Sequence, residues 1–179
     1  MKKLKDFTIQ FVGLSTGIHL FDYRIDKTFF EEFEYNELND IDVLASVKLV
    51  KKETLLEFNF KVSGNVNVNC DLTNEPYAES INGDFDLVVK FGEDYNDENE
   101  EILIIPHGEY EINVAQYIYE LIVLSIPSKR IHPGVKDGTL QSDILERLEE
   151  LSPKEKDNTT NKETIDPRWD TLKKLLTDK

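Results

Sequence analysis

The chain has 179 residues, of which 36 are Asp or Glu and 21 are Lys or Arg, so its formal net charge is −15. Such a charge repels polyphosphates, which argues against non-specific binding of nucleic acid or of anionic membranes. The single cysteine, Cys70, excludes an intramolecular disulfide and fits a reducing compartment. The sequence shows no apolar run of signal-peptide length and no window with the ~18 apolar residues of a membrane span, so we expect a soluble cytoplasmic protein.

Alternating apolar and polar residues dominate the first hundred positions, which is typical of half-buried β-strands. Strands are expected over 7–12, 18–25, 42–51 and 102–105. Three further strands have apolar residues at alternate positions: Leu56, Phe58, Phe60 and Val62; Val66, Val68, Cys70 and Leu72; Phe85, Leu87, Val89 and Phe91. The pairs Gly64-Asn65 and Asn82-Gly83 are predicted to form turns. Because consecutive strands with short turns pair antiparallel, we expect an α+β fold, with an antiparallel sheet or partly open β-barrel covered by helices.

Three segments have helical features. Residues 26–33 predict a short helix capped by Asp26. The apolar residues of 114–125 share one helix face, with Asn113 as a candidate cap and Pro127 as the stop. A weaker helix is predicted from Ser142 to Leu151.

Residues 93–101 hold six acids and no base, so the sequence predicts a loop here rather than a strand. Two interpretations remain open for this loop. It is either a solvated hairpin tip or a docking site for a basic partner.

Gly13 to Gly17 matches G-x-S-x-G, the nucleophile elbow of hydrolases, with Ser15 as the serine. That motif needs a following helix, whereas 18–25 alternates like a strand, so a loop or hairpin is expected. The possible metal ligands are Cys70, His19, His107 and His132. Their spacing lacks the close pairing of zinc ligands, and no phosphate-binding glycine loop is present. We therefore expect no catalytic residue, no metal and no cofactor, and a buried, inert thiol at Cys70.

Residues 128–136 form a locally basic segment in this acidic chain, because they include Lys129, Arg130 and Lys136 and no acid. Basic residues at a helix C-terminus complement the helix macrodipole, which is one explanation. The other is contact with RNA phosphate or with an acidic partner surface. Lys129, Arg130 and the nearby His132 are therefore candidates for partner binding.

The C-terminal region has its own pattern. We expect one domain over 1–151, a disordered linker over 152–164 and an amphipathic helix over 165–179. The partner-binding candidates in this helix are Asp166, Pro167, Arg168, Trp169 and Leu172. Asp166 suits the N-cap, Pro167 the first helical position, and Trp169 starts a narrow apolar stripe. A helix this short is marginal alone, so it docks either on its own domain or in a groove of a partner.

Three stretches in this order together resemble the bacterial YceD family, a domain-of-unknown-function family associated with accumulation of large-subunit ribosomal RNA. They are GNVNVNCDLTNEP, INVAQYIYELIVLSIPSKRIHP and DPRWDTLKKLL. In that family the first stretch often carries C-x-x-C, and a third Cys or a His often follows the helix and proline. Here Cys70 and His132 match, but Thr73 occupies the second cysteine position. This departure weakens any metal or redox role, because two soft ligands do not close a tetrahedral site.

The resemblance implies a non-enzymatic ribosome biogenesis factor that supports synthesis, processing or stability of large-subunit ribosomal RNA. The implied partner is a ribosomal RNA precursor or a large-subunit assembly intermediate, contacted directly or through a basic ribosomal protein. The alternative is an acidic adaptor or chaperone that binds a basic ribosomal protein through 93–101. A hydrolase built on Ser15 is a third hypothesis.

Overall fold

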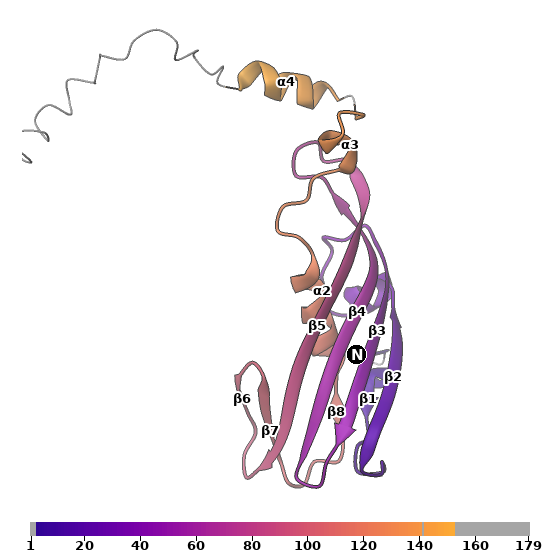
Figure 1. Ribbon diagram of the computed structural model, residues 1–179, viewed down its shortest axis with the longest axis vertical. Coiled ribbons are helices and arrows are strands. Elements are labelled where there is room, and N and C mark those ends of the chain that lie inside the picture. The colour runs from indigo at the N-terminus through magenta and orange to yellow at the C-terminus, as the bar shows by residue number, and fades with distance from the viewer. Residues whose placement is uncertain (1–2, 141, 153–179) are drawn as a thin grey trace, which may run out of the picture. The chain divides into compact units, whose positions relative to one another are not determined.

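The structure is a computed structural model that describes residues 3–140 and 142–152 (Figure 1). Its elements, in chain order, are a 3₁₀ helix Lys3–Phe7, β1 Thr8–Ile9, β2 Gly17–Ile25, α1 Lys27–Glu31, β3 Asp40–Lys51, β4 Leu55–Asn69, β5 Pro76–Gly92, β6 Asn96–Asn99, β7 Ile102–Pro106, β8 Ile112–Asn113, α2 Ala115–Ser125, α3 Pro133–Lys136 and α4 Asp143–Leu151.

The chain divides into two compact units, Met1–Ser142 and Asp143–Lys179. The first unit therefore ends before α4, whereas the sequence places the domain boundary at residue 151. α4 matches the predicted weaker helix, and none of its residues is buried. The predicted linker after Ser152 and the predicted helix 165–179 lie outside the described residues.

The first unit is built on one open sheet of six strands in the order β2-β3-β4-β5-β7-β6. All neighbouring strands are antiparallel except β5 and β7, which are parallel. The chain leaves β5, forms β6 at the edge and returns as β7 between the two. The predicted α+β class with a mostly antiparallel sheet is confirmed. The sheet is not a closed barrel, because β2 and β6 remain as its edges.

β4 and β5 run straight through both predicted turns, so the turn predictions at Gly64 and Gly83 are wrong. Their register is unbroken from Leu55–Lys90 to Asn69–Pro76. A Cβ on Gly64 would lie 2.7 Å from the Cα of Val43 in β3. A Cβ on Gly83 would collide with the side chain of Ser125 in α2. The two glycines therefore permit close approach of neighbouring segments within continuous strands.

β4 is also shorter at its end than predicted. It ends at Asn69, so Leu72, expected to continue an apolar run, lies in the following loop and is 39% exposed. Cys70, by contrast, is 2% exposed, as expected for a buried thiol. The loop after Asn69 turns the chain back into β5.

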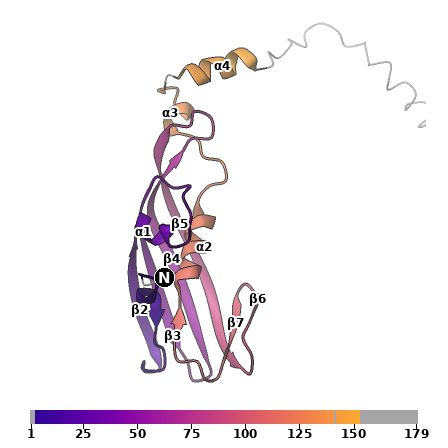
Figure 2. The ribbon, with the colours of Figure 1, turned by 180° about the vertical axis from the view of Figure 1, so that it is seen from behind.

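Helices α1 and α2 cover one face of the sheet, while the opposite face is open to solvent (Figures 1 and 2). The carboxylate of Asp26 accepts the N–H of Phe29 at 3.3 Å, which confirms the predicted cap of α1. The N-cap of α2 is Val114 rather than the predicted Asn113, whose Oδ1 accepts the Ala115 N–H at 3.0 Å from one position earlier, and α2 ends before Pro127 as predicted. Apolar side chains from the covered face of the sheet and from both helices form the core.

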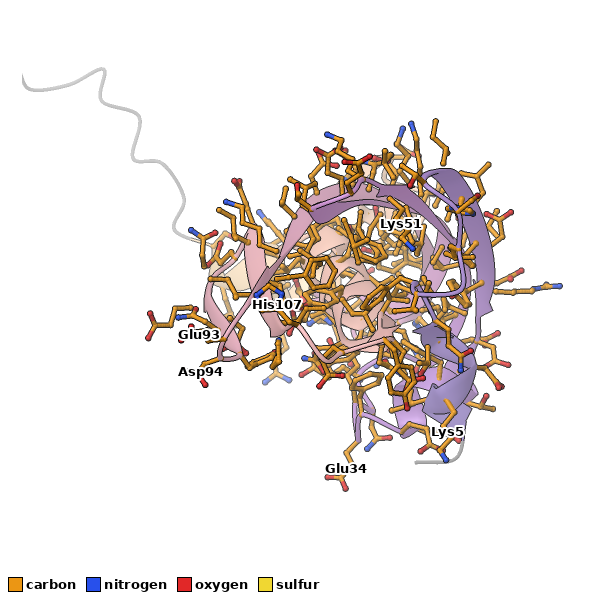
Figure 3. All side chains as sticks on the ribbon, turned by 90° about the horizontal axis from the view of Figure 1, so that it is seen from below. Lys5, Glu34, Lys51, Glu93, Asp94 and His107 are labelled. Atoms are coloured by element: carbon orange, nitrogen blue, oxygen red, sulfur yellow. The ribbon has the colours of Figure 1, made fainter. Side chains whose placement is uncertain are left out.

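Residues 93–101 contain the strand β6, where a loop was predicted. β6 pairs antiparallel with β7 in an irregular register, and all its residues are exposed. An edge strand with both faces in water needs no apolar residue, so the alternation that reveals other strands is absent. Figure 3 shows the preceding Glu93 and Asp94 projecting outward from the rim of the unit.

The N-terminal strand β1 is shorter than the predicted 7–12 and pairs with β8 outside the main sheet. The segment after it turns and enters β2, a strand where a nucleophile elbow requires a helix. The expected loop or hairpin at Gly13 to Gly17 is therefore confirmed. Lys51 Nζ holds this turn by donating to the carbonyls of Phe11 at 2.8 Å and Leu14 at 2.7 Å (Figure 3).

Candidate functional site

Two of the three family-like stretches meet where β4 ends and β5 begins. The loop 70–75 contacts segment 130–134, which leads from α2 into α3. We call this contact the clasp and define it by residues 70–75 and 130–134. The Asp71 N–H donates to the Arg130 carbonyl at 2.8 Å, and the Asp71 carboxylate accepts the Arg130 N–H at 2.7 Å and its Nε at 3.3 Å.

The loop of the clasp is closed by its own backbone. The Cys70 N–H donates to the Glu75 carbonyl at 2.9 Å, and the Asn74 N–H donates to the Cys70 carbonyl at 2.8 Å. Asn74 has a φ of 59°, a left-handed conformation that asparagine adopts more readily than most residues. The sequence thus folds 70–75 into a tight turn that presents the Cys70 sulfur to segment 130–134.

The Cys70 sulfur lies among hydrogen-bond donors. The His132 N–H donates to Cys70 Sγ at 3.3 Å. Burial raises the pKa of the Cys70 thiol, but hydrogen bonds from the His132 N–H, from the hydroxyl and N–H of Thr73 and from the Leu72 N–H outweigh it and lower the pKa to about 7. Thr73, itself 4% exposed, thus supplies a donor at the position where the family often carries a second cysteine.

His132 is bound on both sides. Its Nδ1 accepts the Gly134 N–H at 2.9 Å and so caps α3, and its ring meets Tyr77 edge-on with the ring centroids 5.4 Å apart. The Tyr77 hydroxyl is buried. Burial, followed by the nearby Glu79 carboxylate, raises the pKa of Tyr77 to about 12. The clasp therefore packs around a neutral phenol.

The sequence-derived metal candidates do not gather at one place. Cys70 and His132 meet in the clasp, whereas His19 Nε2 is 2.8 Å from the Ser15 carbonyl and His107 stacks on Phe91. Over residues 3–140 and 142–152 there is no group of three or more His, Cys, Asp or Glu side chains that could hold a metal ion.

The predicted basic candidates lie together after α2, but their surroundings differ. The Arg130 side chain is 30% exposed and lies between two carboxylates, with Nε 3.3 Å from Asp71 and Nη1 3.9 Å from Glu37. Its charge is therefore largely compensated inside the unit, whereas Lys129 is exposed. The candidates Asp166, Pro167, Arg168, Trp169 and Leu172 lie outside the described residues.

Sequence reasoning missed a second surface, where α2 lies beside β5. A groove of about 520 Å³ is lined there by Gly83, Asp84 and Phe85 of β5 and by Tyr117, Leu121 and Leu124 of α2, among others. We call it the edge groove. A signal was present in the sequence, since Gly83 sits at an inward position of the β5 alternation, where a neighbouring segment approaches closely.

Comparison with known proteins agrees with the resemblance seen in the sequence. Residues 58–176 match the family described as large ribosomal RNA subunit accumulation protein YceD. The match spans most of β4, all of β5, α2 and both halves of the clasp. The chain matches no curated protein and no solved structure. No helix in the described ranges is long and apolar enough to cross a membrane. Because the match covers more than half of the sequence, the chain belongs to the YceD family of large ribosomal RNA subunit accumulation proteins.

Proposed function

We propose that the protein is a non-enzymatic, cytoplasmic ribosome biogenesis factor that supports synthesis, processing or stability of large-subunit ribosomal RNA. The observation that carries this proposal is the family match over residues 58–176. The clasp supports a role in binding rather than in chemistry. Its thiol is 2% exposed, and its imidazole Nδ1 accepts a backbone N–H, so both groups take part in holding the clasp together.

The charges favour an indirect route to ribosomal RNA. The net charge of −15 disfavours long-range attraction to phosphate, and Arg130 is compensated by Asp71 and Glu37. Direct contact through segment 128–136 would therefore depend on Lys129 and Lys136. A basic ribosomal protein provides the other route to the assembling subunit.

A second candidate function is therefore an acidic adaptor or chaperone for a basic ribosomal protein. The specific observation in its favour is β6, which holds acidic side chains on an exposed strand at the edge of the sheet. Such a surface attracts basic segments, and its attraction weakens as salt screens exposed charges.

Deletion of the gene, followed by quantification of ribosomal RNA precursors and of the ratio of large to small subunits, tests the leading proposal. We expect a loss of mature large-subunit RNA, restored by the intact gene. Normal precursors together with a normal subunit ratio would contradict it. Co-purification at low salt separates the two routes, because retention of one basic protein after ribonuclease treatment favours the adaptor and retained precursor RNA favours direct binding.

A complementation experiment tests the candidate partner-binding residues of the C-terminal segment. A chain that ends at Ser152 lacks Asp166, Pro167, Arg168, Trp169 and Leu172. We expect this chain to keep the folded sheet, measured by circular dichroism and urea unfolding, and to fail to restore ribosomal RNA accumulation. Full complementation by the shortened chain would show that these residues do not bind the partner.

A further inference from the structure

Much of β5 has an unpaired edge. β7 pairs with β5 only from Val88 to Gly92, and among the described residues no strand pairs with 76–87 on that side. The Val88 N–H donates to the Glu101 carbonyl at 2.8 Å, which fixes the side to which Val88 points. Backbone groups alternate along a strand, so Asp86, Asp84 and Asn82 direct their N–H and C=O groups to the same side. A strand added at this edge could hydrogen-bond to this row of backbone donors and acceptors.

The edge groove runs along this unpaired row. Its apolar wall is formed by Leu121 and Leu124 of α2 together with the rings of Tyr117 and Phe85. Leu124 is 83% exposed, the largest exposed fraction among the large apolar side chains of the described residues. Leu121, in contrast, is 8% exposed and anchors the helix. The groove thus offers hydrogen bonds on one side and apolar contact on the other.

Acidic groups surround the groove. Asp84 and Glu120 line it, and none of its lining residues is Lys or Arg. Burial, followed by the charges of Tyr95, Glu120 and Asp97, raises the pKa of Tyr117, which also lines the groove, to about 12. The Asp84 carboxylate makes no hydrogen bond or ion pair within the described part of the chain. Lys61 of β4 is the cross-strand neighbour of Asp84 and offsets part of its charge, but Asp84 and Glu120 leave the lining of the groove net negative, which favours a cationic segment.

We propose that the edge groove binds an extended, lysine- or arginine-rich segment of a partner protein, which pairs as an added strand with residues 82–86 of β5. Alternate apolar side chains of that segment would pack on Leu121 and Leu124, and its basic side chains would point to the opposite face of the sheet, where Asp84 lies. Strand addition of this kind obtains affinity from backbone hydrogen bonds and specificity from alternate side chains. The inference deepens, and rests on, the second candidate function, because it names the surface that an adaptor would use.

The binding test uses the full chain and a fluorescent synthetic peptide of about nine residues, a common strand length, in which lysine alternates with leucine or valine. We expect salt-sensitive binding, no binding of the glutamate counterpart, and no binding of a version with proline at alternate positions, which cannot donate to β5. Leu124→Arg should weaken binding at least about tenfold. The matched control is Leu20→Arg on β2, because Leu20 is 72% exposed and far from this groove in the strand order.

A charge test complements the apolar one. Asp84→Lys combined with Glu120→Lys should abolish binding of the lysine peptide. Glu53→Lys combined with Glu109→Lys makes the same charge change at exposed residues that do not line the groove, and should reduce binding only slightly. Equal losses in the two double variants would overturn the groove as the site, since overall charge alone would then explain attraction.

Amide hydrogen exchange identifies the mode of binding. The lysine peptide should slow exchange at Asn82, Asp84 and Asp86. Peptide binding without this protection would overturn strand addition. Protection in the free chain that is lost in Trp169→Ala/Leu172→Ala would show that the chain's own C-terminal segment fills the groove. Protection that grows with protein concentration would show a second copy, and either result would overturn the proposal.

The outcomes separate the groove from the proposed function. If Leu124→Arg loses the peptide yet fully restores ribosomal RNA in the deletion strain, the groove has no part in that role and this inference fails alone. If the peptide binds as expected while gene deletion leaves ribosomal RNA unchanged, the proposed function fails and the groove stands as a peptide-binding surface.

Discussion

The clasp precedes the first residue of β5 and the edge groove lies beside the middle of that strand, and the two regions use polar groups in opposite ways. In the clasp, Asp71 accepts two hydrogen bonds from Arg130, and the Cys70 sulfur accepts the His132 N–H. In the edge groove, the outward backbone groups of Asn82, Asp84 and Asp86 have no strand partner within the described ranges, and the Asp84 carboxylate, opposite Lys61 in the register, makes no hydrogen bond there. Polar groups that bond to one another hold a fold together, whereas unpaired groups at a strand edge are available to another chain. This difference favours a structural role for the clasp, which positions the segment after α2, and a binding role for the groove, which we propose accepts a partner segment.

The largest expected effect comes from Gly83→Val, because a side chain at this position would push α2 away from β5. The new side chain would collide with Ser125 and press on Leu121, whose Cδ1 lies 3.2 Å from the Cβ position. We expect the free energy of unfolding in urea to fall by about 1–3 kcal/mol, the usual cost of overpacking. Peptide binding in the groove should be lost as well, since α2 forms one wall.

Gly13→Ala is the matched control for Gly83→Val, because nothing lies within 4 Å of a Cβ at Gly13. Its stability should change by no more than about 0.5 kcal/mol. An unchanged free energy of unfolding for Gly83→Val would mean that α2 can shift freely, and the groove would then be a loose surface.

Alanine at two aspartates compares the regions directly. Asp71→Ala should lower the free energy of unfolding by about 1 kcal/mol, because Arg130 loses its backbone and side-chain acceptor near the surface. Asp84→Ala should stay within about 0.5 kcal/mol of the parent. Binding of the lysine peptide should show the reverse order, with the larger loss in Asp84→Ala. Similar effects of both changes on stability and on binding would contradict the division of roles.

The strands of the sheet were predictable because the alternation of apolar and polar residues indicates both where a strand lies and which of its side chains face the core. The same pattern also argued against a turn at Gly64. The even-numbered residues on both sides of it are apolar and buried, namely Phe60, Val62, Val66 and Val68. A turn is expected to interrupt such a phase, whereas a glycine that admits a neighbouring backbone leaves it intact. The unbroken parity was therefore better evidence than the dipeptides Gly64-Asn65 and Asn82-Gly83.

Other features depend on contacts distant in the sequence. Nothing local to Arg130 indicates that Asp71, from a loop between two strands, neutralises it. Nothing local to Ile102 indicates that β7 pairs in parallel with β5, because strand order is decided by where the chain returns. The clasp could be predicted only as far as the resemblance linked Cys70 with His132. The edge groove requires knowledge of which side of β5 is unpaired.

The smallest expected effect concerns the titration of Cys70. The pKa of this thiol is lowered from the ordinary 9.0 to about 7 in the folded protein. A lowered pKa means that the folded state binds the proton less tightly than the unfolded chain. The contribution to stability is therefore complete above the ordinary pKa and is lost as pH falls through about 7. Between these values the free energy of unfolding should rise with pH, and this rise should be absent in Cys70→Ala.

Thr73→Val tests the cause of the lowered pKa. Valine has a similar shape but no hydroxyl, so the Cys70 thiolate loses one hydrogen-bond donor while the N–H groups of His132, Thr73 and Leu72 remain. The thiol pKa, followed by ultraviolet absorbance of the thiolate, should move upward toward its ordinary value. The exposed Thr54, in the turn between β3 and β4, provides the control Thr54→Val, which should leave the titration unchanged. An unaltered pKa in Thr73→Val would show that backbone donors alone stabilise the thiolate, and that the hydroxyl at the second cysteine position only fills space in the clasp.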